Sequence, residues 1–286
     1  MNINLTDIND IRFLLDSHGF RFSKSMGQNF LIASWVPKRI ADSAPIDKDT
    51  AVLEIGPGIG CLTRELAQRA GKVVSVELDK ALKDVLRETV SDCDNVEIIF
   101  GDALKINLNE LAEEKFGALH PAVCANLPYN VTTPLLTEIL KAGIFDSITV
   151  MIQKEVAQRI CAAPNTADYG AFTVFCQWYT EPEALFDVPP SCFIPQPKVT
   201  SSVIRMKKRD APPTRVNNEE LMFKIVRAAF NQRRKTFVNA VSSGLGYDKQ
   251  IIESSLKICE LDTRIRGEAI SIAQFAQISD EIEKIF

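Results

Sequence analysis

The chain has 286 residues, 46% of them hydrophobic and 24% charged, with a formal net charge of −4 and a pI near 5.4. This composition excludes a disordered chain and provides enough apolar material for one full domain and a smaller one. Because no apolar run is long enough to span a bilayer and the acidic N-terminal segment lacks a targeting pattern, we expect a cytoplasmic protein.

The cysteine and histidine content argues against metal chemistry. Seven cysteines occur without a C-x-x-C pair, which indicates reduced thiols without a catalytic role. His18 and His120 are the only histidines. We therefore expect no metal site.

The first part of the chain has the alternation expected of an α/β fold. Over residues 40–206, β-type runs alternate with helical stretches, which favours a mainly parallel sheet with helices on both faces. We assign residues 40–206 to a catalytic domain. Residues 1–39 are interpreted as an N-terminal extension.

A glycine-rich turn lies within residues 51–63, between an apolar strand and a helix. Gly56, Gly58 and Gly60 fall at every second position, whereas the nicotinamide and flavin fingerprint is G-x-G-x-x-G and would need a glycine at Cys61. Glycine has no Cβ, so such a turn lets the backbone approach a ligand closely. The turn therefore suits a nucleotide-type cofactor and weakens the NAD interpretation, and taken alone it is equally well explained as an ordinary strand-to-helix turn.

Two acidic residues follow the next two β-type runs. Glu77 ends the run at 73–76, and Asp102 follows the run at 96–100. Open α/β sheets place their ligand contacts at such strand ends. Taken alone, each acid is better explained as a solvated carboxylate or a helix N-cap, so the order of the motifs carries the information.

The tetrapeptide Asn-Leu-Pro-Tyr at residues 126–129 indicates which atom is modified. The N6 amino group of adenine is a weak nucleophile because its lone pair is delocalised into the ring. The side-chain carbonyl of Asn126 and the backbone carbonyl of Leu127 or Pro128 can accept its two N–H bonds. Pro128 stiffens this loop, and Tyr129 offers a face on which a flipped base stacks.

The order glycine turn, acid, acid and Asn-Leu-Pro-Tyr is the layout of a Rossmann-like methyltransferase that binds S-adenosylmethionine. In that layout Gly56 and Gly58 pass under the methionine portion of the cofactor, with Asn126 nearby. Glu77 pairs with the ribose hydroxyls, and Asp102 pairs with the adenine amino group. No strong base is needed, because a sulfonium is already an excellent leaving group.

The last part of the chain differs in pattern. Residues 207–216 form a charged, proline-broken linker, which is a natural boundary. Beyond it we expect a small all-helical C-terminal domain over residues 217–286. Helix-type apolar spacing covers four segments: residues 217–231, 234–243, 249–261 and 271–286.

Taken together, these motifs resemble one family over nearly the whole chain: the small-subunit ribosomal RNA adenine dimethyltransferases of the KsgA type. The resemblance also includes Ser-Met-Gly-Gln-Asn-Phe-Leu at 25–31, Phe-Ile-Pro-Gln-Pro-Lys-Val at 193–199 and Phe-Asn-Gln-Arg-Arg-Lys-Thr at 230–236. One departure is Thr200, where the family usually has Asp. This departure affects a local turn contact and not the chemistry.

The resemblance implies a reaction and further site residues. Asn29 and Leu31 belong to a segment that closes over the cofactor in this family, and Phe193 is expected opposite Tyr129 as the second aromatic around the target base. The implied reaction is dimethylation of two adjacent adenines in the 3′-terminal hairpin of 16S rRNA, coupled to small-subunit biogenesis. The implied partner is a 30S or pre-30S particle, and we expect a monomer.

Basic residues are unevenly distributed along this acidic chain. Residues 205–235 contain ten Lys or Arg against three acids, a pattern that suits phosphate contacts and also occurs on plain solvated faces. The resemblance places residues 233–235 where the second domain faces RNA. The candidate RNA-binding residues are Arg21, Lys24, Lys207, Lys208, Arg209, Arg233, Arg234 and Lys235.

Three alternatives remain open at this point. A 23S rRNA dimethyltransferase of the antibiotic-resistance type shares the cofactor and Asn-x-Pro-Tyr features. A DNA adenine methyltransferase can share the same chemistry, although the short helical tail disfavours it. An assembly factor with secondary methylation activity is the third, and it is compatible with the enzymatic role.

Overall fold

A computed structural model describes residues 3–21 and 28–285 of the chain, which divide into two compact units. The first unit contains the residues up to Ala157 together with Glu183–Lys208. The second contains Gln158–Pro182 and the residues from Arg209 onward. Each unit has its own buried apolar core.

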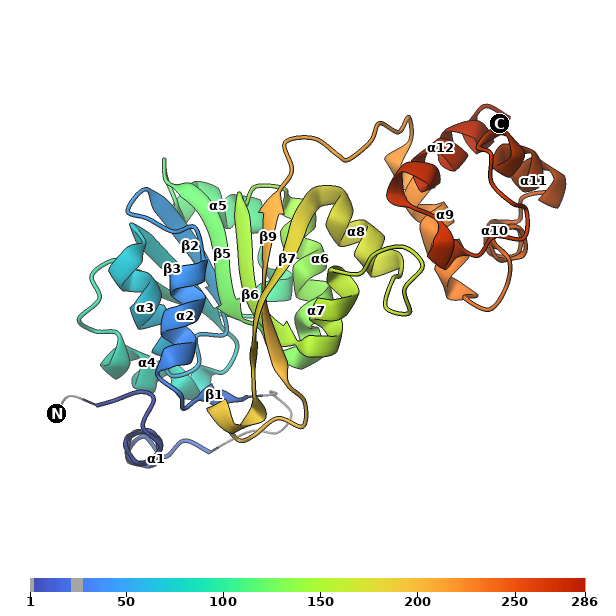
Figure 1. Cartoon of the computed structure of the whole chain (residues 1–286). Coiled ribbons are helices and arrows are strands. Elements are labelled where there is room, and N and C mark those ends of the chain that lie inside the picture. The colour runs from blue at the N-terminus through green and yellow to red at the C-terminus, as the bar shows by residue number, and fades with distance from the viewer. Residues whose placement is uncertain (1–2, 22–27, 286) are drawn as a thin grey trace. The chain divides into compact units, whose positions relative to one another are not determined.

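A seven-stranded sheet forms the centre of the first unit (Figure 1), in the order β4-β3-β2-β5-β6-β9-β7. The pairs from β4 to β6 are parallel, and β9 is antiparallel to β6. The strands are β2 (Thr50–Ile55), β3 (Lys72–Glu77), β4 (Val96–Phe100), β5 (His120–Asn126), β6 (Ser147–Gln153), β7 (Thr180–Val188) and β9 (Ser201–Lys208).

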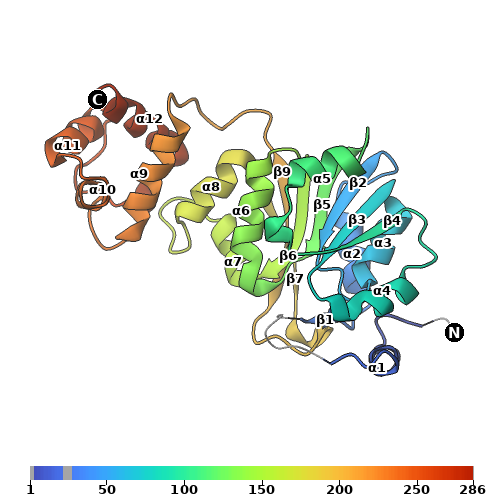
Figure 2. The same cartoon turned by 180° about the vertical axis from the view of Figure 1, so that it is seen from behind.

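Helices cover both faces of this sheet, which confirms the predicted mostly parallel α/β architecture. The α2 and α3 helices lie on one face and α5 and α6 on the other (Figures 1 and 2). Every residue of β2 is buried, as expected for a central parallel strand covered on both sides. The helices are α1 (Ile8–Ser17), α2 (Trp35–Ser43), α3 (Cys61–Arg69), α4 (Lys83–Thr89), α5 (Leu108–Lys115), α6 (Thr132–Ala142) and α7 (Lys154–Ile160).

The N-terminal segment packs onto the carboxyl edge of the sheet. The short strand β1 (Phe30–Leu31) pairs antiparallel with β8 (Phe193–Ile194). The ring of Phe30 joins Leu14 of α1 and Ile59 of the glycine turn in one buried cluster. Asp7 caps α1 by accepting the N–H of Asn9 at 2.8 Å, which fixes where that helix begins.

The second unit is helical. The predicted helical character of the C-terminal segments is confirmed. The α10 helix begins at Phe237 because its N-cap, Thr236, takes extended backbone geometry. Arg234 and Lys235 therefore precede α10. The helices are α8 (Ala171–Tyr179), α9 (Glu219–Asn231), α10 (Phe237–Leu245), α11 (Lys249–Ile258) and α12 (Ile272–Glu283).

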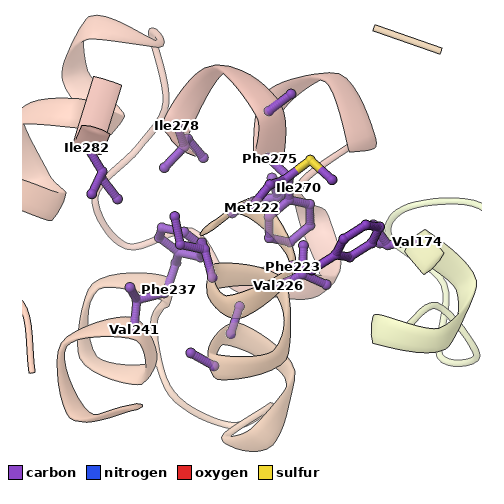
Figure 3. Close-up of a cluster of buried hydrophobic side chains, with 14 of the residues drawn as sticks. Val174, Met222, Phe223, Val226, Phe237, Val241, Ile270, Phe275, Ile278 and Ile282 are labelled. Atoms are coloured by element: carbon purple, nitrogen blue, oxygen red, sulfur yellow. The ribbon is translucent and has the colours of Figure 1, made fainter. Parts of the chain in front are cut away.

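One segment falls in a different unit from the sequence-based division. Residues 158–182 lie within the range 40–206 that we assigned to the catalytic domain, yet they form part of the helical unit. The physical reason is apolar burial. Tyr169 and Trp178 are 0% and 1% exposed within a core that includes Phe237 and Phe275. Figure 3 shows how side chains from α9, α10 and α12 meet in this core.

Truncating Phe275 to alanine is expected to destabilise the helical unit by about 3–5 kcal/mol, because it leaves a cavity in a fully buried site. Trp35 and Trp178 are the only tryptophans, so in a Trp35→Phe background the fluorescence of buried Trp178 reports unfolding of this unit during a urea titration. The control is Ile258→Ala, at a side chain that is 62% exposed, with an expected change below about 0.5 kcal/mol. Equal effects of the two substitutions would contradict this description of the core.

Candidate active site

One cavity lies at the carboxyl edge of the parallel strands. Its volume is about 1210 Å³ including the solvent at its mouth, and the turns after β2, β3, β4 and β5 line it together with residues 28–31. The structure brings together ten of the predicted site residues on its wall: Asn29, Leu31, Gly56, Gly58, Glu77, Asp102, Asn126, Leu127, Pro128 and Tyr129.

The glycine turn forms the floor of this cavity. Gly56 and Gly58 have φ values of 73° and 60°, a region that side chains with a Cβ rarely adopt. A Cβ added to Gly58 would lie 3.3 Å from the ring of Phe30. The turn therefore leaves its backbone open to a ligand and close to the N-terminal segment.

Glu77 and Asp102 differ in their surroundings. Glu77 is buried and accepts the backbone N–H groups of Asp79 at 2.8 Å and Gly58 at 3.3 Å. Burial raises the pKa of its carboxyl above the ordinary value. Asp102 lies nearer the surface and accepts the backbone N–H of Leu104 at 3.1 Å. Both carboxylates can accept hydrogen bonds from the hydroxyl or amino groups of a ligand.

Two leucines that we did not predict complete this side of the cavity. Leu78 and Leu104 are 54% and 38% exposed although both line the cavity. Leu78 follows Glu77 by one residue, and Leu104 follows Asp102 by two. An apolar residue this close after each acid was the sequence signal that could have identified them. A pair of apolar side chains beside a carboxylate fits a flat purine ring with an exocyclic amino group.

Glu54 is a second residue that sequence reasoning missed. It lines the cavity but is 1% exposed, and the hydroxyls of Thr63 and Ser75 donate to its Oε2 at 2.7 and 2.6 Å. Burial, opposed by these two hydrogen bonds and assisted by the charge of Glu77, raises the pKa of Glu54 to about 7. The sequence signal that could have identified Glu54 was a charged residue inside an otherwise apolar strand.

The Asn-Leu-Pro-Tyr loop is held by its own backbone. Leu127 donates its N–H to the Met151 carbonyl at 3.1 Å. The Pro128 carbonyl accepts from the N–H of Val131 at 3.2 Å and from the Thr132 hydroxyl at 3.0 Å. A carbonyl oxygen has two lone pairs, so the Pro128 carbonyl is fully used. Of the two backbone acceptors that we considered, Leu127 is the better one.

Tyr129 is anchored at its hydroxyl. Its Oη lies 2.5 Å from Oγ of Ser201, a fully buried residue at the start of β9. Because β9 and β5 flank β6 in the sheet, the Tyr129 side chain reaches across the end of β6. Burial raises the pKa of Tyr129, so the phenol remains protonated near neutral pH. The hydrogen bond limits rotation of the ring.

Phe193 does not take the place that we expected for it. Its side chain is 1% exposed, lies in the core with Val36 and Ile40, and lines no part of the cavity. Pairing of Leu31 with Phe193 in the β1–β8 ladder accounts for this burial. In this structure Tyr129 is therefore not faced by Phe193, and the expected aromatic pair is not formed.

The predicted basic residues differ in exposure and in contacts. Arg21, Lys207, Lys208, Arg233, Arg234 and Lys235 are exposed, whereas Lys24 lies outside the described residues. Arg209 instead donates from its Nε to the carbonyls of Gln177 and Thr180 at 3.0 and 3.1 Å. Arg233 donates to the carbonyls of Ala167 and Tyr169 at 2.7 and 3.2 Å. These two arginines therefore have structural contacts that the sequence did not reveal.

Neither a metal centre nor a membrane span is found in the part of the chain that the structure describes. Over residues 3–21 and 28–285, no three His, Cys, Asp or Glu side chains are grouped to hold a metal ion. Within the same residues, no helix is long and apolar enough to cross a bilayer.

The fold and the cavity define a Rossmann-like methyltransferase of the kind that uses S-adenosylmethionine. A family model described as ribosomal RNA adenine dimethylase matches residues 19–284, and the chain belongs to this family.

Curated relatives and solved structures agree with this assignment. A protein of Alkaliphilus metalliredigens named "Ribosomal RNA small subunit methyltransferase A" is 46% identical over 271 residues, or 94% of each chain. One of the same name in Geobacillus thermodenitrificans is 46% identical over 278 residues, covering 96% of this chain and 95% of its own.

Among solved structures, the 23S rRNA methyltransferase ErmE is similar with a TM-score of 0.68 and 28% identity, over 89% of this chain and 100% of its own. A dimethyladenosine transferase of Plasmodium falciparum has a TM-score of 0.71 at 21% identity, over 87% of this chain and 95% of its own, and so supports the fold.

Glu54 is expected to make stability depend on pH. Its folded pKa of about 7 lies above the ordinary 4.5, so the folded state binds the extra proton between these values. Stability should therefore fall as pH rises through this window, by roughly 3 kcal/mol. Glu54→Gln should remove this part of the slope in urea titrations from pH 4.5 to 8. The control Glu114→Gln, at an exposed side chain, should leave the pH dependence of stability unchanged. An unchanged pH dependence in Glu54→Gln would contradict the raised pKa of Glu54.

The Tyr129–Ser201 contact predicts coupled kinetic effects. Tyr129→Phe and Ser201→Ala each remove the same hydrogen bond, so each should lower kcat/KM for RNA methylation about five- to tenfold. The double variant should be no worse than either single variant, within about twofold. Ser202→Ala, which removes a hydroxyl bound to Asp187, is the matched control and should combine independently with Tyr129→Phe. Multiplicative losses in the Tyr129–Ser201 pair would show that the two residues act separately.

Proposed function

We propose that this protein transfers methyl groups from S-adenosylmethionine to N6 of two adjacent adenines in the 3′-terminal hairpin of 16S rRNA. The observation that carries the proposal is the Asn126–Tyr129 loop, which opens into the same cavity as the glycine turn, Glu77 and Asp102. Relatives whose names specify the small subunit are 46% identical, against 28% for the 23S enzyme, and this difference favours 16S rRNA.

Each part of the cofactor would have its own contacts in the cavity. Gly56 and Gly58 would lie beside its methionine portion. Glu77 would accept from the ribose hydroxyls, and Asp102 from the adenine amino group between Leu78 and Leu104. Asn29 and Leu31 would cover the cofactor from the N-terminal segment. When bound, the cofactor supplies a methyl group on a sulfonium, which is a strong electrophile with a good leaving group.

The protein contributes positioning and fixed dipoles. The side-chain carbonyl of Asn126 and the backbone carbonyl of Leu127 would accept the two N–H bonds of adenine N6, which localises the lone pair toward the methyl group. Both dipoles then stabilise the positive charge that develops on nitrogen, without reorganisation during the step. The alkylated nitrogen is acidic enough to lose its proton to a carbonyl or to water. Tyr129 would stack on the target ring.

The second methylation constrains this arrangement. A monomethylated adenine has one N–H fewer, so the two acceptors cannot both be occupied by N–H groups in the second round. One acceptor, together with stacking on Tyr129, must then suffice to orient the nitrogen.

The exposed cations would hold the RNA. Arg21, Lys207, Lys208, Arg234 and Lys235 are exposed and suited to phosphates. Arg209 and Arg233 contribute less to the proposal because backbone carbonyls already bind them. We propose that the substrate is a 30S or pre-30S particle and that a cytoplasmic monomer acts on it.

Asn126→Ala should lower kcat for methylation of 30S particles by about 10²- to 10³-fold, the usual cost of losing one preorganised dipole at a reacting centre. The measurement is the incorporation of labelled methyl groups. Asn109→Ala, at an exposed asparagine on α5, is the control and should retain full activity. The melting temperature should be unchanged in both variants, so that a loss of activity is not a loss of fold. Wild-type turnover by Asn126→Ala would contradict the proposed chemistry.

The similarity to ErmE keeps a 23S rRNA substrate as the second candidate. Expression in a macrolide-sensitive cell separates the two functions. We expect no protection against macrolides, and resistance that requires Asn126 would instead favour the 23S function.

A further inference from the structure

An aromatic pair lies on the surface of the first unit, outside the cavity. Trp35, at the start of α2, is 41% exposed. Its ring centroid is 6.2 Å from that of Phe186 on β7, with the two ring planes tilted by 52°. The other tryptophan of the chain, Trp178, is 1% exposed. A large amphipathic ring held by a second ring at the surface is the kind of residue that recognition sites use.

Two cations on α2 adjoin this pair. The guanidinium carbon of Arg39, one turn after Trp35, lies 4.1 Å from the centroid of the Phe186 ring. Lys38 is exposed beside it in the sequence. Among the residues that the structure describes, neither cation forms an ion pair with an acid. The aromatic surface therefore carries positive charge along one side.

The acids on the same two elements are already neutralised. Asp42 of α2 pairs with Arg69 at 2.6 Å. On β7, Glu181 pairs with Arg209 at 2.8 Å, Glu183 with Arg205 at 2.7 Å and Asp187 with Lys154 at 2.6 Å. The charge that remains available to a partner is that of Lys38 and Arg39, so this surface is complementary to an anion.

Chain connectivity places this surface near the active site. Leu31 lines the cavity, and Trp35 follows it by four residues, which span at most roughly 14 Å. On the other side, β7 leads through the turn at Pro190–Cys192 into β8, which pairs with β1 at Leu31. An RNA strand whose target base enters the cavity would thus have neighbouring nucleotides within reach of Trp35.

We propose that Trp35, Phe186, Lys38 and Arg39 form an accessory platform on which an unpaired base of the substrate RNA stacks while its phosphates contact the two cations. The proposal rests on the proposed function only in taking ribosomal RNA as the substrate. Single-stranded nucleic acid combines a flat π-face with regularly spaced negative charge, and aromatic platforms beside cations bind it with little dependence on base identity. The platform would orient the RNA outside the cavity and would not take part in methyl transfer.

Kinetics on 30S particles from a strain lacking the modification test the platform. Trp35→Ala should raise KM for the particle about tenfold and leave kcat and the Kd for S-adenosylmethionine unchanged. Trp35→Phe should recover most of the loss, because it keeps an aromatic face. Phe13→Ala is the matched control, since Phe13 is an exposed aromatic (61%) on α1 and its truncation should leave KM unchanged.

A second measurement identifies the partner of Trp35. Ultraviolet cross-linking of the complex with 30S particles, followed by nuclease digestion and mass spectrometry, should find a nucleotide adduct on the peptide that contains Trp35. An unchanged KM in Trp35→Ala, or a cross-link from this peptide to a ribosomal protein, would overturn the platform. Failure of the wild-type protein to methylate the particle would instead overturn the proposed function, so the two failures are distinguishable.

Discussion

The parallel register of β2 with β3 and β5 is the constraint on which the rest of the structure depends. Val52 lies opposite both Val73 and Ala122, so the strands that precede the glycine turn, Glu77 and Asn126 end at one edge of the sheet. A shift of one residue would turn every buried side chain of β2 to the other face. The buried, mostly apolar interior of the sheet therefore fixes the positions of polar groups that are far apart in the chain.

The site built on this edge relies on positioning more than on acid–base chemistry. The Leu127 carbonyl and the Tyr129 ring are fixed by backbone and side-chain bonds to β6 and β9, and the methyl transfer that we propose needs only such fixed dipoles and a stacked base. Burial raises the pKa of Glu54 in the cavity to about 7, and two hydroxyls donate hydrogen bonds to its Oε2. These contacts assign Glu54 a structural role on the strand that precedes the glycine turn.

The sequence predicts those parts of the molecule that follow from local pattern. Gly56, Glu77, Asp102 and Asn126 each follow a β-type run, and parallel strands bring such ends together, so their shared cavity was predictable. Contacts between distant segments could not be predicted from the sequence. The burial of Phe193 depends on pairing with Leu31, the hydrogen bonds of Arg209 and Arg233 depend on carbonyls of the segment 167–180, and the anchoring of Tyr129 depends on Ser201. The placement of residues 158–182 was not predictable either, because it depends on the packing of Trp178 in the core of the helical unit.

The central claim is that this protein modifies two adjacent adenines of small-subunit RNA. The most direct measurement is mass spectrometry of RNA fragments after incubating the protein and labelled S-adenosylmethionine with 30S particles from a strain that lacks the modification. The account predicts two neighbouring N6,N6-dimethyladenosines in the 3′-terminal hairpin of 16S rRNA. Under the same conditions, an unlabelled 16S rRNA would contradict the account, as would label found only in 23S rRNA when 50S subunits are supplied.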